Sequence, residues 1–195
     1  MIRVMVLGAT GGIGQRVCAQ LIEPKYHVMA LGRNQIDLGA VDSAAQLSYT
    51  LTEYQPDWII NCAGVFVDNH ADHKNVFDVN VGSNWNIIKH YLQNPPGTAV
   101  KIVMLGSNAY RSGRKNYMLY AASKAALHNL WQGAVENFQE TNVSIGIMHF
   151  GPVATSMIRN LSTAKQLDPD YVASHIIDFC DNMTHSQLFE MENTK

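Results

Sequence analysis

The chain has 195 residues, 47% of them hydrophobic and 15% charged, so it can bury one sizeable core but is short for two ordinary domains. Its formal net charge of −2 and the lack of a Lys/Arg-rich run exclude the charge pattern of a nucleic-acid-binding or membrane-surface protein. Met1 leads directly into an apolar segment, and no apolar run approaches the ~20 residues that span a bilayer. We therefore expect one cytoplasmic domain over residues 1–195.

Short apolar runs alternate along the chain with longer segments of helical period. The runs predict strands over residues 2–7, 26–31, 57–62, 100–105 and 143–149, with a short last strand over 187–191 at the sheet edge. Helices are expected over residues 12–22, 41–54, 71–92, 119–138 and 171–180. This alternation predicts an α/β fold with a doubly wound parallel sheet, in a Rossmann-type three-layer α/β/α arrangement.

The second crossover is unusually short. Only three residues separate Arg33 from the pair Asp37-Leu38, whereas a parallel crossover needs roughly a dozen or more. Because the usual helix after the second strand cannot fit there, we expect it to be missing and the third strand to be vestigial. The stretch over residues 41–54 then supplies the next helix.

A glycine-rich turn follows the first strand in the run IRVMVLGATGGIG. Gly8, Gly12 and Gly14 allow the backbone to turn tightly enough for a pyrophosphate to approach the N-terminus of the next helix. At the end of the second strand, a carboxylate would hold the ribose of NAD, and a cation would accept the 2′-phosphate of NADP. Arg33 stands at that place, so we expect NADP to be preferred, with Asp37 as the residue that would instead favour NAD.

A second motif lies in the run YAASKAAL. Tyr120 and Lys124 share one face of a helix, and a nearby cation moves the pKa of a phenol toward the range useful for proton transfer. Ser107 ends an apolar run thirteen residues before Tyr120, whereas Tyr117 has no lysine four residues further on. With the glycine turn, these residues indicate a nicotinamide-dependent oxidoreductase that interconverts a carbonyl and an alcohol in a small-molecule substrate.

The chain resembles the short-chain dehydrogenase/reductase family over nearly its whole length. The resemblance is carried by LGATGGIG at residues 7–14, NCAG at 61–64, FDVNV at 77–81, and the trio Ser107, Tyr120 and Lys124. It implies that Tyr120 transfers the proton, while Lys124 lowers the pKa of Tyr120 and bonds the nicotinamide ribose. It also implies that Ser107 orients the substrate oxygen and that Asn80 holds a water of the proton relay.

The same resemblance implies a larger cofactor site, in which Asp37 and Leu38 lie by the adenine. Its positions are Gly8, Thr10, Gly11, Gly12, Ile13, Gly14, Arg33, Asp37, Leu38, Asn61, Ala63, Gly64, Tyr120, Lys124, Gly151, Val153 and Thr155. Gly151, Val153 and Thr155 match the family's segment against the nicotinamide carboxamide, although Phe150 replaces its first proline. The long helices over 71–92 and 119–138 imply a homodimer or homotetramer.

Two alternatives remain for the function. The run LGRNQIDL, followed later by YQPDWIINCAG, resembles nucleotide-sugar reductases such as dTDP-4-dehydrorhamnose reductase, and so favours a nucleotide-sugar reductase or epimerase. The other alternative is a non-catalytic NAD(P)-sensing regulatory protein. A sensor would keep the cofactor fold but would not need Ser107, Tyr120 and Lys124 together.

Other chemically active side chains are interpreted as structural or solvated. The cysteines, which are Cys18, Cys62 and Cys180, lie in apolar segments and are expected to be reduced core thiols. His70 and His73 lack a convincing third ligand, so no metal is expected. Arg111, Arg114 and Lys115 would favour an anionic substrate, but a solvated loop is the preferred interpretation.

Overall fold

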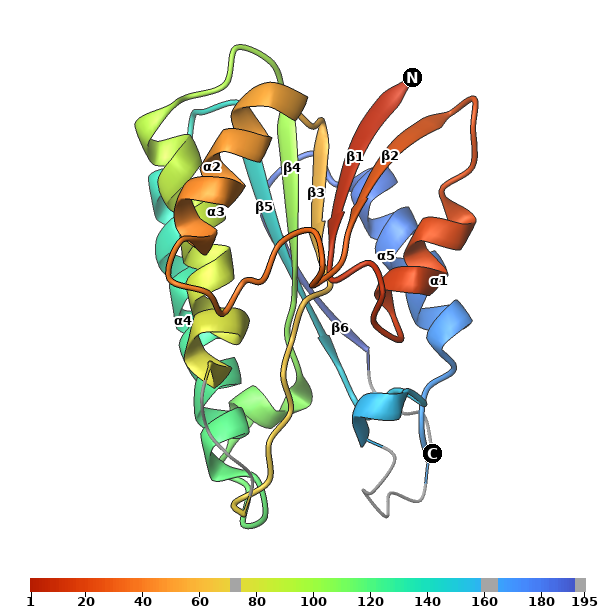
Figure 1. Cartoon of the computed structure of the whole chain (residues 1–195), viewed down its shortest axis with the longest axis vertical. Helices are drawn as coiled ribbons and strands as arrows, with labels where there is room; N and C mark the ends of the chain where they lie inside the picture. The colour runs from red at the N-terminus through yellow and green to blue at the C-terminus, as the bar shows by residue number, and fades with distance from the viewer. Residues whose placement is uncertain (71–74, 159–164, 192–195) are drawn as a thin grey trace.

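The computed structural model describes residues 1–70, 75–158 and 165–191, and it is a three-layer α/β/α sandwich (Figure 1). All strand pairs are parallel, in the order β2-β1-β3-β4-β5-β6. The strands are β1 (Ile2–Leu7), β2 (Tyr26–Leu31), β3 (Trp58–Asn61), β4 (Val100–Leu105), β5 (Val143–Phe150) and β6 (Gln187–Met191). The expected doubly wound parallel sheet is confirmed, and β6 lies at its edge as expected.

Helices cover both faces of this sheet. The helices are α1 (Gly14–Gln20), α2 (Ser43–Tyr54), α3 (Ser83–Gln93), α4 (Met118–Asn137) and α5 (Pro169–Asn182). Figure 1 shows α2, α3 and α4 on one face and α1 with α5 on the other. None of these helices is long and apolar enough to cross a membrane. A π-helical turn (Asp78–Gly82) leads into α3, and residues 71–74 of the helix expected over 71–92 lie outside the described residues.

The alternating side chains of β1 explain why both faces are covered. Successive side chains of a strand point to opposite faces, so a central strand that is apolar throughout must be buried on both sides. Val4 and Val6 belong to the core beneath α1 and α5, whereas Met5 and Leu7 belong to the core beneath α2, α3 and α4. All four side chains have no solvent exposure.

The shortened crossover has a simple form. Residues 32–42 make consecutive turns with neither helix nor strand, and the chain then enters α2. The usual helix is missing from this crossover, as expected. The vestigial strand expected here, between β2 and α2, is absent altogether. The reason is that α2 returns the chain directly to β3, which pairs with β1, and β2 is left at the sheet edge.

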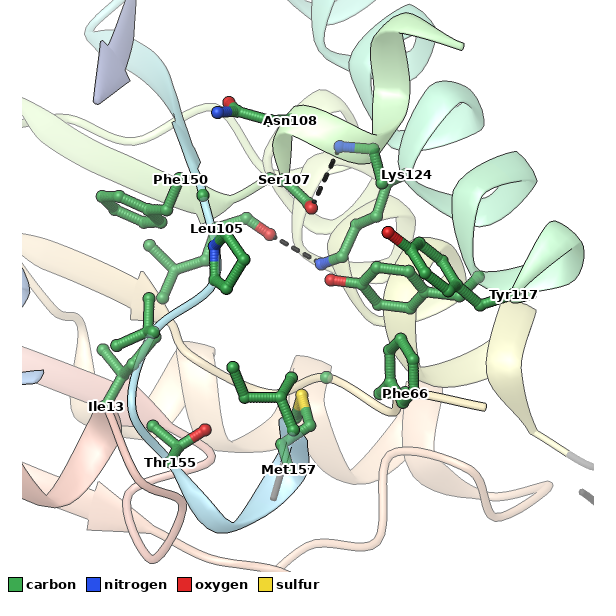
Figure 2. A pocket seen from close by; sticks show the side chains of 18 of the residues that line it. Ile13, Phe66, Leu105, Ser107, Asn108, Tyr117, Lys124, Phe150, Thr155 and Met157 are labelled. Atoms are coloured by element: carbon green, nitrogen blue, oxygen red, sulfur yellow. Dashed lines mark hydrogen bonds between the residues drawn. The ribbon is translucent and has the colours of Figure 1, made fainter. Parts of the chain in front are cut away.

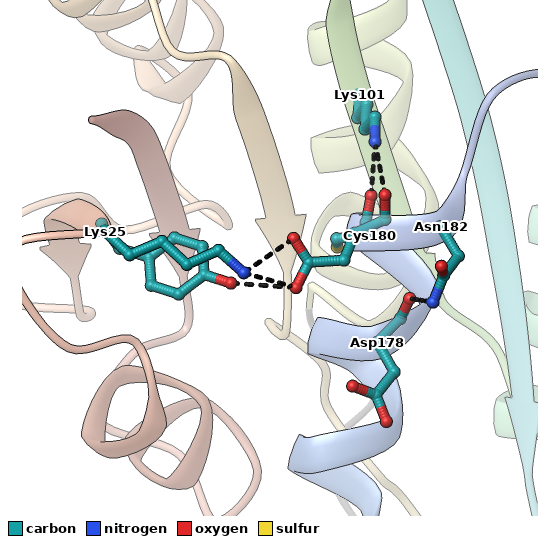
Figure 3. Close-up of polar contacts among 7 residues, drawn as sticks. Lys25, Lys101, Asp178, Cys180 and Asn182 are labelled. Atoms are coloured by element: carbon teal, nitrogen blue, oxygen red, sulfur yellow. Dashed lines mark hydrogen bonds and ion pairs between the residues drawn. The ribbon is translucent and has the colours of Figure 1, made fainter.

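The C-terminal end of α5 is fastened to the sheet by two lysines (Figure 3). Lys101 Nζ in β4 donates to the carbonyl oxygens of Cys180 and Asp181 at 2.6 and 3.2 Å. The Asp181 carboxylate accepts from Lys25 Nζ at 2.9 Å and from the Tyr26 hydroxyl at 3.0 Å. Lysines that bond the last carbonyls of a helix also complement its dipole, so Lys101 caps α5.

Candidate active site

A continuous cleft follows the carboxyl ends of the parallel strands, where ligands of open α/β sheets bind. One part, the glycine-loop pocket, is lined by the turn after β1 and by residues 32–38. The other part, the tyrosine pocket, is lined by Ser107, Tyr120 and Lys124. The two share Ile13, Cys62, Ala63, Gly64, Thr155 and Met157. The structure therefore brings the two sequence motifs to one site.

The glycine turn is packed so closely that side chains are excluded. Gly8 has φ +68°, and a Cβ there would lie 2.6 Å from the backbone nitrogen of Ala63. A Cβ on Gly14 would lie 2.2 Å from the carbonyl oxygen of Gly8. The missing side chains let α1 begin directly against the turn that lines the glycine-loop pocket.

Most expected cofactor positions line this cleft. Those in the glycine-loop pocket are Gly8, Thr10, Gly11, Gly12, Ile13, Arg33, Asp37, Leu38, Ala63, Gly64 and Thr155. Tyr120, Lys124, Gly151 and Val153 line the tyrosine pocket instead. Arg33 and Asp37 are both exposed at the same pocket, so one cation and one carboxylate stand together in its lining.

Asn61, for which the resemblance implies a cofactor contact, lines neither pocket, and that contact stays a prediction. It is 1% exposed at the end of β3, and its Nδ2 donates to Ser83 Oγ and Asn84 Oδ1, each at 2.9 Å. Its Oδ1 accepts from the backbone N–H of Ala63 at 3.1 Å. Asn61 therefore joins β3 to α3 and fixes the cleft wall at Ala63.

Asn80 also faces the interior. Its side chain exchanges two hydrogen bonds with the backbone of Val65, at 2.8 and 2.9 Å, and donates to Ser123 Oγ at 2.9 Å. Both amide hydrogens are therefore used within the protein, and Asn80 lines neither pocket. Its place is directly behind the wall, since a Cβ on Gly64 would lie 3.6 Å from Asn80 Oδ1. These contacts position residues 64 and 65, and the water-holding role that the resemblance implies for Asn80 stays a prediction.

Ser107, Tyr120 and Lys124 converge as the spacing predicts. Ser107 follows β4, while Tyr120 and Lys124 occupy the first two turns of α4. The Ser107 hydroxyl lies close enough to the Tyr120 hydroxyl to influence its pKa. Lys124 Nζ donates to the Leu105 carbonyl oxygen at 2.8 Å and lies 5.8 Å from the centre of the Tyr120 ring. Figure 2 shows Ser107 and Lys124 on one side of the cavity and Phe66 with Met157 opposite.

Burial is the largest influence on the pKa values of Tyr120 and Lys124. It raises the pKa of Tyr120, an effect that the Ser107 hydroxyl opposes and the nearby Tyr117 reinforces. Burial also lowers the pKa of Lys124 to about 8. The expected lowering of the Tyr120 pKa by Lys124 is therefore not the net direction in this structure, because both groups are desolvated. Tyr120 is a protonated phenol at neutral pH and can donate a proton.

A histidine pair behind Ser107 was missed by the sequence reasoning. The backbone N–H of Ser107 donates to His149 Nδ1 at 3.1 Å, and His149 Nε2 lies 3.0 Å from His128 Nδ1. Tyr110 stacks on His149 with ring centres 4.0 Å apart. Burial lowers the pKa of His149 to about 4, so the ring is neutral and its Nδ1 accepts. The signal in the sequence was a lone histidine in the apolar run of β5.

The loop after β5 closes the cleft between its two parts. β5 continues through Phe150, which is 3% exposed and occupies the place of the family's proline without ending the strand early. Val153 pairs in a short bridge with Leu167, which holds the loop across the cleft. A Cβ on Gly12 would lie 2.5 Å from Thr155 Cγ2, so this loop packs directly against the glycine turn.

The remaining polar and thiol side chains separate into three groups. Cys18, Cys62 and Cys180 are free thiols, as expected, and burial raises the pKa of each. The backbone N–H of His70 donates to Asp68, whereas His73 lies outside the described residues. Arg111 pairs with Glu190, and Lys115 is exposed. Arg114, for which a solvated loop was preferred, lines the tyrosine pocket together with Tyr117.

Known proteins resemble this chain in sequence and in fold. The short chain dehydrogenase family model matches residues 45–166. An uncharacterized oxidoreductase of Staphylococcus aureus is 25% identical over 96% of this chain and 94% of its own. An L-xylulose reductase of Caenorhabditis elegans is 26% identical over 86% of this chain and 76% of its own.

A solved structure of 4-hydroxyisoleucine dehydrogenase complexed with NADH has a TM-score of 0.82, at 24% identity over 98% of this chain and 97% of that one. At this identity the likeness shows the fold alone. The family model covers more than half of the present sequence and includes the segment with Ser107, Tyr120 and Lys124. The chain therefore belongs to the short-chain dehydrogenase/reductase family, and it is an NAD(P)-dependent oxidoreductase that acts on carbonyl or alcohol substrates.

Proposed function

We propose that the protein interconverts a carbonyl and an alcohol with a preference for NADP over NAD, and that Tyr120 is its general acid and base. The observation that carries this proposal is the meeting of Ser107, Tyr120 and Lys124 in one pocket of a cleft that continues into the glycine turn. The bound dinucleotide would supply or accept the hydride. The protein's own groups have to hold the substrate oxygen and move its proton.

The proton has a defined route in the direction of reduction. The Tyr120 O–H donates its proton to the substrate oxygen while Ser107 Oγ holds that oxygen by a hydrogen bond. The phenolate left on Tyr120 is stabilised by the ammonium of Lys124, whose pKa of about 8 keeps it largely charged at neutral pH. The raised pKa of Tyr120 suits this direction, because it keeps the proton on the oxygen until the substrate oxygen becomes basic.

The residues present fit a dinucleotide along the cleft. The glycine turn and the N-terminus of α1 would hold the diphosphate, and Thr155 with Val153 would lie by the nicotinamide. Arg33 would pair with a 2′-phosphate, which is the basis for the proposed NADP preference. Asp37 competes for the same end of the cofactor, and it is the feature that would favour NAD.

Replacing Tyr120 with phenylalanine tests the assignment. Tyr120→Phe keeps the ring but removes the proton donor, so turnover should fall by about 10²- to 10⁴-fold while NADPH binding persists. Tyr117→Phe is the matched control, because Tyr117 lines the same pocket but has no lysine four residues on. The readout is NADPH oxidation across a panel of carbonyl compounds. Near-normal turnover by Tyr120→Phe would refute the catalytic assignment.

The two alternative functions predict different results in the same panel. A nucleotide-sugar reductase, favoured by the helix-free turns at 32–42, would act only on sugar nucleotides. A sensor would bind NADPH tightly and turn over no carbonyl compound. Ser107, Tyr120 and Lys124 meet in one pocket, and this supports an enzyme over a sensor.

We also propose that the protein forms a homodimer or homotetramer through α3 and α4. These two helices form part of the outer layer on one face of the sheet (Figure 1). Trp85 on α3 is 43% exposed and Met118 on α4 is 61% exposed, so both helices carry apolar side chains at the surface. Sedimentation at micromolar concentration should show two or four copies, and a monomer alone would refute the proposal.

A further inference from the structure

Arg114 lines the tyrosine pocket and is only partly exposed to solvent. It belongs to the segment that joins the short 3-10 helix Asn108–Arg111 to α4. Its Nη2 is 3.4 Å from the carbonyl oxygen of Asn108, the residue that follows Ser107. The guanidinium is therefore tied to the backbone next to Ser107, whose hydroxyl is assigned to the substrate oxygen.

The Nε–H of Arg114 is buried and has no acceptor among the described residues. Burying such a donor without a partner is costly, and the cost is greater when the group is charged. The neighbouring Arg111 is different, since it pairs with the carboxylate of Glu190. Among the described residues, Arg114 makes no ion pair, so its charge is left for a ligand.

The rest of the tyrosine pocket favours an anion. Its described lining includes two cations, Arg114 and Lys124, and neither Asp nor Glu. Its other walls are largely apolar, with Phe66, Tyr117 and Met157 among them. A charge interaction is stronger beside such walls than in water, because the local dielectric constant is lower.

The phosphates of the cofactor do not account for the charge of Arg114. The expected positions for its phosphates are the glycine turn and Arg33, which line the glycine-loop pocket. Arg114 lines only the tyrosine pocket, on the side of Ser107 and Tyr120. An anion held by Arg114 therefore belongs to the substrate.

We propose that Arg114 binds a carboxylate of the substrate, and that the substrate is a carbonyl compound bearing this carboxylate close to the reacting carbon. The free Nε–H and an Nη–H form a fork that matches the two oxygens of a carboxylate. This inference rests on the proposed function. In reduction, the carbonyl carbon gains hydride from the reduced nicotinamide and its oxygen gains the proton of Tyr120. The carboxylate is unchanged, and the product is a hydroxy acid.

Substitution of Arg114 gives the first test. The substrates are 2-oxobutanoate and benzoylformate, each compared with its neutral methyl ester, with NADPH oxidation as the readout. The unmodified enzyme should favour the acids in kcat/KM by roughly 10- to 150-fold, the range that hydrogen bonds to a charged group supply. Arg114→Met should remove that preference by lowering kcat/KM for the acids alone. Lys115→Met, which removes an exposed cation one residue away, should retain it.

A binding measurement keeps the proposal testable if neither pair is turned over. Calorimetric titration should show benzoate binding more tightly than its neutral isostere benzamide, with the difference lost in Arg114→Met and kept in Lys115→Met. Equal affinities for benzoate and benzamide in the unmodified enzyme would overturn the proposal. Tighter binding of phenyl phosphate than of benzoate would overturn the choice of a carboxylate.

The two proposals fail in different ways. Loss of the acid preference in Arg114→Met together with full turnover by Tyr120→Phe would refute the role of Tyr120 and support Arg114. The reverse pattern, in which Tyr120→Phe is inactive and Arg114→Met keeps the acid preference, would refute only the carboxylate site. That second pattern would leave Arg114 as a structural partner of the neighbouring Asn108, whose Oδ1 is also buried and unpaired among the described residues.

Discussion

Gly106→Ala would place a methyl group where the histidine pair supports Ser107. A Cβ on Gly106 would lie 2.2 Å from His149 Nδ1 and 2.5 Å from His149 Cε1, closer than any real contact. His149 has no solvent exposure, stacks on Tyr110 and bonds His128, so its ring has no room to retreat. The methyl group must therefore displace the turn at Ser107 or the ring itself.

The expected cost can be estimated from these contacts. Overpacking a well-packed interior costs about 1–3 kcal/mol, and loss of the Ser107–His149 hydrogen bond adds about 1 kcal/mol. A domain is typically stable by ~5–15 kcal/mol, so the variant should still fold. A shift of about 1 Å in a group that positions substrate costs on the order of 10²-fold in rate. We therefore expect the variant to fold with a lower free energy of unfolding. Its turnover should fall much more, on the order of 10²-fold.

Urea denaturation and steady-state turnover measure the two effects. Gly113→Ala is the matched control, because a Cβ at that glycine has no neighbour within 4 Å. In a His149→Ala background the clash is removed, so adding Gly106→Ala should then cost almost nothing, and the double-mutant cycle should show this coupling. If Gly106→Ala matches Gly113→Ala in both measurements, the assigned support of Ser107 by His149 is refuted.

Three further predictions concern the cofactor, the fold and pH. Arg33→Ala should erase most of the preference for NADPH in binding titrations, since a charge-assisted hydrogen bond supplies roughly 1.5–3 kcal/mol; equal affinities of the unmodified protein for NADPH and NADH would contradict it. Lys101→Met removes two hydrogen bonds to the last carbonyls of α5 and should lower the free energy of unfolding by about 1 kcal/mol, so an unchanged urea midpoint counts against the cap. Because burial lowers the pKa of His149 to about 4 from its ordinary 6.5, the unfolded chain takes up this proton first as pH falls. Stability should then decrease between about pH 6.5 and 4, and His149→Asn should lose that part of the slope.

The strands were predictable because this sheet is parallel and covered on both faces. The runs at β1, β2 and β4 are continuously apolar or nearly so, and their observed bounds coincide with the expected ones. The missing helix at 32–42 was also predictable, since it follows from chain length alone. The expected helix over 12–22 is shorter, because residues 11–13 belong to the glycine turn.

The roles of individual side chains were less accessible, because they depend on partners far away in the sequence. The motifs locate Asn61 and Asn80, and the fold alone shows that their amides bond Ser83, Asn84, Val65 and Ser123. The motif locates such a residue and says nothing about which way its amide points. The interpretation of Arg114 as solvated failed for the same reason: its contact with Asn108 is set by the fold of a loop.

The pairing of α1 with α5 constrains the order in which the protein can fold. Gln20 in α1 bonds the carbonyl of Asp170 in α5, 150 residues later, and Val17 shares its core with Ile176. Contacts between such distant residues form slowly, because a long loop must close first. While the chain is being synthesised, the apolar side chains of β1, β4 and β5 on this face, such as Val4, Val103 and Met148, have only α1 to cover them until α5 arrives. A nascent chain that ends at β5 therefore presents a half-covered sheet, the kind of surface that recruits chaperones.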